Sequence, residues 1–130
     1  MKKFLITLSL LLSTTAFAAI DLAKIERAIE CVTLYDSRIK LTEMSLNKSV
    51  AELKANGLSR ELLTFAIKED EKRMGIFAKE YVSVSNVATP KEREAMQAIL
   101  KKYSDKVQLL ATTNLAELRA YTNTSRQKCE

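Results

Sequence analysis

The sequence contains no histidine and no tryptophan, and it has only two glycines and one proline among its 130 residues. Without histidine, no imidazole can activate a nucleophile, bind a metal ion or serve as an axial haem ligand. Two glycines are too few for a dinucleotide-binding fingerprint, a phosphate-binding loop or a rich set of tight β-turns. We therefore expect no cofactor, no metal site and no turn-rich β fold.

The first eighteen residues have the composition of a cleavable secretory signal peptide. A basic start precedes an apolar run over residues 4–12, and Ala16 and Ala18 supply the small-x-small pattern of a cleavage site. The run is much shorter than the about 20 residues of a membrane-spanning helix. We expect residues 1–18 to be removed, which places residues 19–130 in the periplasm of a bacterial cell without a transmembrane segment.

The expected mature chain has the size of one ordinary domain, and a chain of this length buries about two-thirds of its unfolded surface. Loss of Lys2 and Lys3 lowers the formal net charge by two, from +5 to +3. Nucleic-acid-binding surfaces show a larger basic excess with interleaved aromatic residues. The charge therefore argues against a nucleic-acid partner and favours acidic partners or anionic surfaces of the cell envelope. The partner we expect is another protein in the cell envelope.

Both cysteines, Cys31 and Cys129, lie in the expected mature chain. An even pair in an oxidising compartment predicts a disulfide. A redox site would need a Cys-x-x-Cys motif or a neighbourhood that stabilises a thiolate, and the sequence has neither. Two separate buried thiols are disfavoured because Cys129 is the penultimate residue and chain ends are usually exposed. The pair predicts one structural disulfide that closes almost the whole mature chain.

The first half of the mature chain predicts a long helix followed by a short one. Asp21 is suited to cap the long helix, whose apolar residues recur at spacings of three and four. These residues are Leu22, Ile25, Ile29, Val32 and Ile39. Ser49 and Glu52 match a capping box for the short helix, and Gly57 suits the left-handed position after its end. One unbroken helix through residue 55 is the alternative.

Ser59 is suited to cap a third helix. Its apolar face also follows the helical spacing. The face consists of Leu63, Ile67, Met74, Phe77, Tyr81 and Val84, with Asp70 as its one polar member. The β-branched and polar segment 82–86 predicts fraying at the end of this helix.

The strongest local pattern marks the start of the last helix. Thr89 can cap it, Pro90 fits the first helical position, and Glu92 can complete the capping box. The apolar stripe that follows has Asn114 inside it and predicts a helix that ends near Tyr121.

These elements predict an all-α fold, an up-and-down bundle of three to four helices with one disulfide. We favour a four-helix arrangement with a short second helix, because its first and last termini lie at the same end, so Cys129 can reach Cys31. A three-helix bundle with a folded-back tail is the alternative. Residues 19–130 would form this single domain.

Three polar residues interrupt the apolar stripes: Asp36, Asp70 and Asn114. A buried polar group costs a few kcal/mol unless it is paired, so each interruption needs a reason. The residues could lie at stripe edges or fix the register of the helices. A second hypothesis is a shared polar binding pocket, with Arg38 or Arg73 as a partner.

The functional expectation follows by elimination. The sequence offers neither the tryptophan platforms nor the glycine-bearing loops of carbohydrate clefts, and no combination of residues indicates catalysis. We expect a non-catalytic protein-binding module of the periplasm, such as an inhibitor, an immunity protein or a regulator of envelope or lysis machinery. A holdase-like chaperone is the alternative, and a small helical enzyme is a third and weaker reading.

Overall fold

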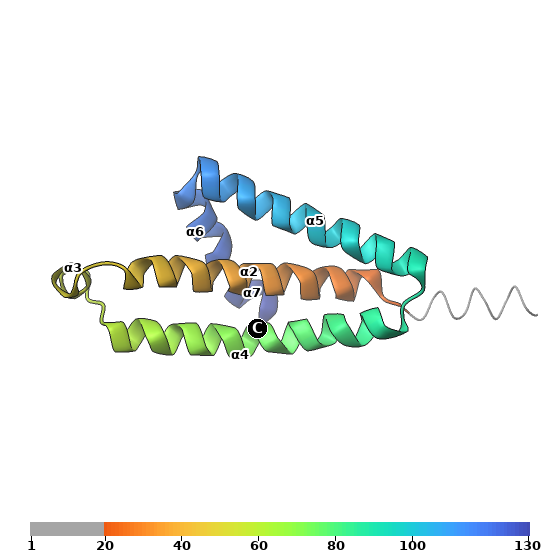
Figure 1. Ribbon diagram of the computed structural model, residues 1–130, viewed down its shortest axis with the longest axis horizontal. Coiled ribbons are helices and arrows are strands. Elements are labelled where there is room, and N and C mark those ends of the chain that lie inside the picture. Colours follow the sequence, from red (N-terminus) through yellow and green to blue (C-terminus); the bar gives the residue numbers. More distant parts are fainter. Residues whose placement is uncertain (1–19) are drawn as a thin grey trace, which may run out of the picture.

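The computed structural model describes residues 20–130, so the predicted signal peptide lies outside the described residues. Its body consists of three long α-helices, α2 (Leu22–Leu46), α4 (Arg60–Val87) and α5 (Pro90–Thr113). Successive long helices run in opposite directions, and α5 diverges from α2 toward its own C-terminal end (Figure 1). Within the described range the protein is an all-helical bundle, as the sequence predicts.

Three short helices complete the described chain. The first, α3 (Val50–Ala55), lies in the connection between α2 and α4 at one end of the molecule (Figure 1). Beyond α5, the chain turns back through α6 (Leu115–Asn123) and ends in α7 (Ser125–Cys129), and both of these helices contact α2. From residue 20 onward, no helix combines the length and the apolar character needed to cross a membrane.

Four helices begin at the residues that the sequence predicts as their caps. The side chains of Asp21, Ser49, Ser59 and Thr89 each accept a hydrogen bond from a backbone N–H in the first turn. At Thr89 the capping box is complete, because the Glu92 carboxylate accepts a bond from the Thr89 N–H at 2.9 Å. Local side-chain chemistry therefore sets where these helices start.

The connection between α2 and α4 also follows the prediction. Gly57 has a positive φ of 71°, the left-handed conformation that ends α3. The N–H of the next residue, Leu58, donates to the Leu53 carbonyl at 2.8 Å, which closes the turn. The first two helices are separate, so the single helix through residue 55 does not form.

Two helix ends differ from the sequence prediction. The segment 82–86 stays helical instead of fraying, and Val84 within it and Tyr81 just before it pack against a buried cluster. This packing offsets the weak helix propensity of β-branched residues. The last predicted helix is interrupted at Asn114, which ends α5 and caps α6. The chain therefore changes direction inside what its periodicity presents as one helix.

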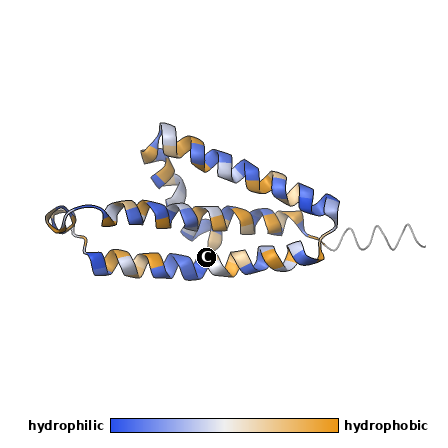
Figure 2. Cartoon of the chain, in the orientation of Figure 1, coloured by the Kyte–Doolittle hydropathy of each residue, from blue (hydrophilic) through white to orange (hydrophobic). Residues whose placement is uncertain are grey.

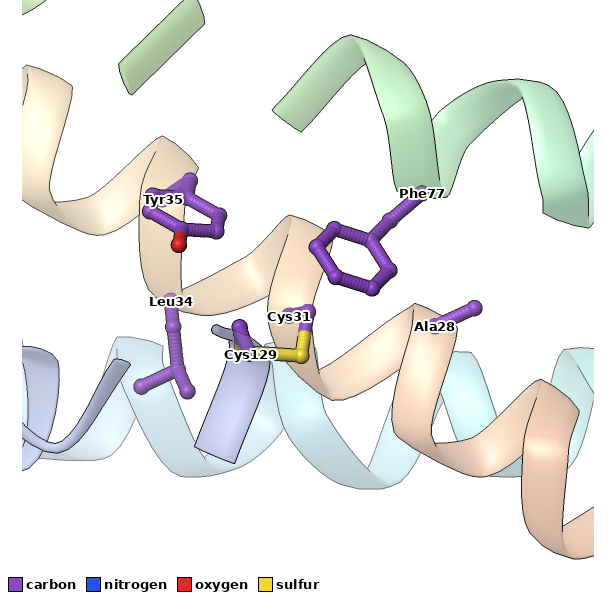
Figure 3. Close-up of a cluster of buried hydrophobic side chains, with 6 residues drawn as sticks. All are labelled: Ala28, Cys31, Leu34, Tyr35, Phe77 and Cys129. Atoms are coloured by element: carbon purple, nitrogen blue, oxygen red, sulfur yellow. A yellow bond between two sulfur atoms is a disulfide. The ribbon is translucent and has the colours of Figure 1, made fainter. Parts of the chain in front are cut away.

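The core consists of two clusters, and α2 contributes to both. One surrounds the disulfide, where the rings of Tyr35 and Phe77 stack with centroids 6.3 Å apart (Figure 3). Its buried members are Ala28, Cys31, Leu34, Tyr35, Phe77 and Cys129. The other joins the N-terminal half of α2 to α5 and to the connection before it. Its buried members are Ile25, Ile29, Ala88, Met96 and Tyr103.

The end of the chain returns to the middle of α2. The predicted disulfide is confirmed, with the Cα atoms of Cys31 and Cys129 5.8 Å apart. Beside it, Arg27 Nε donates to the Lys128 carbonyl at 3.2 Å, and Lys128 Nζ lies 2.6 Å from Glu30 Oε1. The return is made by α6 and α7, and α3 lies in the connection between α2 and α4 instead of acting as a bundle helix. The favoured four-helix arrangement is therefore wrong, and the alternative, a three-helix bundle with a folded-back tail, describes the protein.

Candidate functional site

The structure does not join the three polar residues predicted to share a pocket. Asp36 is half exposed and forms a surface ion pair with Lys40, with 2.9 Å between Oδ2 and Nζ. Asn114 is exposed and caps α6 by accepting a bond from the Glu117 N–H at 3.1 Å. Asp70 alone is buried. Two of the interruptions thus serve their own helices, and the third belongs to a buried polar cluster.

Asp70 is paired with both arginines that the sequence suggests as partners. Arg38 Nε on α2 lies 3.3 Å from Asp70 Oδ2, and Arg73 Nη1 on α4 lies 3.9 Å from Asp70 Oδ1. Burial raises the pKa of the Asp70 carboxyl, and the two guanidinium charges oppose this rise. The carboxylate therefore depends on its two cationic neighbours to remain charged inside the bundle.

The same cluster holds the end of the chain. Arg38 Nη1 donates to the fully buried hydroxyl of Ser125 at 2.8 Å, and Arg73 Nη1 lies 3.3 Å from Glu130 Oε1. Asp70 orients both arginines, and each arginine then contacts the tail at or beside α7. The cluster connects α2, α4 and α7, which makes it a structural support for the folded-back tail.

A row of apolar side chains lies on the surface of α4, and we call it the outer row. Leu62, Phe65, Ile76 and Val87 are 53%, 63%, 61% and 78% exposed. At about 100° per residue they fall within about 60° of one another around the helix axis. Apolar and polar segments alternate along α4 (Figure 2). Since α4 already buries a different apolar face against α2, the outer row is a second face without a partner inside the described chain.

Charged residues divide the outer row. Glu69 and Lys72 lie on the same side of α4, between the pair Leu62 and Phe65 and the single residue Ile76. The surface therefore offers separate apolar anchors with charges of both signs between them. Anchors at helical spacing with polar surroundings are typical of a helix face that binds another protein.

The outer row was not predicted from the sequence. A weak pattern was present, because the separations between its members are all close to whole numbers of helical turns. However, Leu62 is adjacent to buried Leu63, and each residue fits a row of apolar residues that follows the helical period. The sequence alone therefore does not show which row faces the core. Only the packing of α2 on α4 shows which row is covered.

The comparisons with known proteins identify no relatives. No family model matches the sequence, and no characterised protein or solved structure shows significant similarity to the chain. The function must therefore be argued from the residues and their arrangement.

Proposed function

We propose that this chain is an exported, non-catalytic protein-binding module and that the outer row of α4 is its binding face. The single observation that supports this most is the exposure of four large apolar side chains along one line of a helix. Exposing large apolar side chains is unfavourable in water, and apolar residues gathered on one helix face and surrounded by polar ones commonly mark interaction sites. A partner that covers the row would remove this apolar surface from solvent.

The divided character of the row favours one defined partner over many unfolded clients. A holdase needs an adaptable and continuous apolar surface, whereas Glu69 and Lys72 require complementary charges at fixed positions. Phe65 supplies the large aromatic anchor that dominates the affinity of many interfaces. The proposal is therefore an inhibitor, immunity protein or envelope regulator that occupies the surface of a specific protein.

The proposed compartment is the periplasm of a Gram-negative cell. The disulfide between Cys31 and Cys129 is compatible with an oxidising compartment, since such bonds are rare in reducing cytosol. The basic and apolar pattern of residues 1–18 supports export through the general secretory route. Mass spectrometry of protein from the cell envelope tests this part, because it measures both the N-terminal residue and the presence of free thiols.

The binding face can be tested by capture from an envelope extract of the source cell. We expect the immobilised wild-type protein to retain one partner at a fixed stoichiometry and the variant L62S/F65S/I76S to lose it. The matched control is L109S, which replaces an exposed apolar residue of α5 that is outside the row. Circular dichroism should show equal helix content for all three proteins.

Three results would contradict the proposal. Equal capture of the same partner by the outer-row variant would place the binding face elsewhere. Retention of many unfolded proteins in place of one partner would favour a chaperone function. Turnover of an envelope substrate by the purified protein would indicate a catalytic function instead of a binding module or a chaperone.

A further inference from the structure

A polar pocket opens where the C-terminal parts of α2 and α6 meet the start of α4. Its volume is about 340 Å³, which is at the lower end of the range of small-molecule sites. Three of its lining residues are basic, namely Arg38, Lys48 and Arg119, and none of its lining residues is acidic. The pocket therefore concentrates positive charge in a space that suits a small molecule.

Arg38 reaches this pocket in a fixed orientation. Its Nε is paired with buried Asp70 and its Nη1 with buried Ser125, so two of its three nitrogens are engaged on the interior side. A guanidinium group carries five N–H donors in a rigid fork, which leaves Nη2 for a ligand. An arginine held in this way loses little further side-chain entropy when it binds an anion.

Lys48 and Arg119 add charge that the described chain does not neutralise. Both side chains are exposed, and no ion pair within residues 20–130 joins either of them to a carboxylate. The carbonyl ends of α2 and α6 border the pocket, and part of this charge offsets their helix dipoles. Each helix end carries about half an elementary negative charge, so the two ends offset only part of the charge of Lys48 and Arg119. Net positive charge therefore remains beside Arg38.

The hydroxyl groups around the pocket are already used as donors. Thr42 Oγ1 donates to the Arg38 carbonyl at 2.8 Å, and Ser45 Oγ donates to the Leu41 carbonyl at 3.3 Å. Donors for a ligand must therefore come from the three cations and from the amide of Asn123, which also lines the pocket. A ligand that matches this set has acceptor atoms and negative charge.

We infer that this pocket binds a small organic anion of about two negative charges, of the dicarboxylate or phosphate-ester class. Charge-assisted hydrogen bonds from arginine to carboxylate or phosphate oxygens are stronger than neutral ones, and a negatively charged ligand matches the net positive charge that remains beside Arg38. The site is separate from the outer row of α4. Anion binding and partner binding can therefore succeed or fail independently.

The test is calorimetric titration of the disulfide-bonded protein at low ionic strength. The probes are succinate and inorganic phosphate, with the uncharged diamide of succinate as a control ligand. We expect a saturable signal with at least one anion and none with the diamide. A preference for succinate identifies the dicarboxylate class, and a preference for phosphate identifies the phosphoryl class.

Matched variants locate the binding. K48Q and R119Q should each weaken the affinity for the preferred probe about tenfold, because each removes a charged donor. K79Q removes the same charge from an exposed position of α4 outside the pocket and should leave the affinity unchanged. All three positions are exposed, so a folded protein is expected in each case, and its thermal midpoint is measured alongside.

The inference is overturned if neither anion produces a saturable signal, because the three cations then serve only the helix ends and the Asp70 cluster. It is also overturned if K48Q and R119Q bind as tightly as K79Q. Equal weakening by all three variants would indicate non-specific attraction to a basic surface and would likewise contradict a built site.

Discussion

Arg38 on α2 and Asp70 on α4 form an ion pair in the interior of the bundle, with Arg38 Nε 3.3 Å from Asp70 Oδ2. The Asp70 side chain is 3% exposed, whereas that of Arg38 is 21% exposed and reaches the polar pocket. The buried carboxylate thus holds a cation that faces outward. This geometry couples the stability of the bundle to the shape of the pocket.

Replacement of Asp70 by asparagine should destabilise the protein by about 2 kcal/mol, because it leaves Arg38 without its charged partner in a largely desolvated place. The free energy of unfolding in urea measures this effect. The matched control is D36N, which breaks the exposed pair with Lys40 and should cost less than about 1 kcal/mol. Equal costs for the two variants would show that the Asp70 pair has no special role.

The disulfide should be the largest single contribution to the stability of the tail. Its cysteines are 98 positions apart, and in the chain-entropy model a closed loop of about 100 residues contributes about 4.7 kcal/mol. We expect the double variant C31A/C129A to lose about 2–5 kcal/mol in urea unfolding. A reducing agent should destabilise the wild type and have no effect on the variant. A loss below about 1 kcal/mol would mean that packing alone holds α7.

Much of the helical framework could be predicted because its determinants are local. Ser59 and Thr89 act on N–H groups within one turn, and Gly57 supplies a conformation that other residues avoid. The interruption at Asn114 could not be predicted from periodicity. No glycine or proline marks it, and the apolar stripe resumes after it, so the cap that Asn114 forms for α6 is its one local signal.

The sequence also does not show which of the polar residues within the apolar stripes is buried. Asp36, Asp70 and Asn114 interrupt their apolar patterns in the same way, but only Asp70 faces the interior. The apolar pattern of one helix shows on which face a residue lies, but it does not show whether a neighbouring helix covers that residue. The pairing of Asp70 with Arg38 and Arg73 could be suggested because a buried carboxylate requires a cation.

Tyr103 on α5 should make stability depend on pH through Glu26 on α2. The Tyr103 hydroxyl donates to Glu26 Oε1 at 2.8 Å, and this bond, with Lys102 as a second donor, holds the pKa of the Glu26 carboxyl below its usual value of 4.5. A lowered pKa stabilises the fold above the unfolded pKa, and this contribution is lost as the pH falls through the folded pKa.

Tyr103→Phe should therefore raise the pKa of Glu26, as measured by NMR titration of its carboxyl carbon. At neutral pH the variant should also be less stable, by less than about 1 kcal/mol, because the Glu26 side chain is 39% exposed and solvent screens its interactions. This difference should shrink as the pH falls from about 6 to about 3. Tyr81→Phe is the control, since no hydrogen bond within the described chain joins Tyr81 to Glu26. An unchanged Glu26 pKa in the Tyr103 variant would contradict the assignment.

Asn114 should be required for the direction of α6. Its side chain accepts a bond from the Glu117 N–H, and its backbone has φ −154° and ψ 86°, which lies outside the helical region. Asn114→Ala removes the cap and favours helix at this position, so we expect a loss of about 1 kcal/mol in urea unfolding. Asn47→Ala is the control, because Asn47 ends α2 through its backbone N–H. If Asn114→Ala instead gained helix content without losing stability, α5 and α6 could join, and the return of the tail to Cys31 would not depend on this cap.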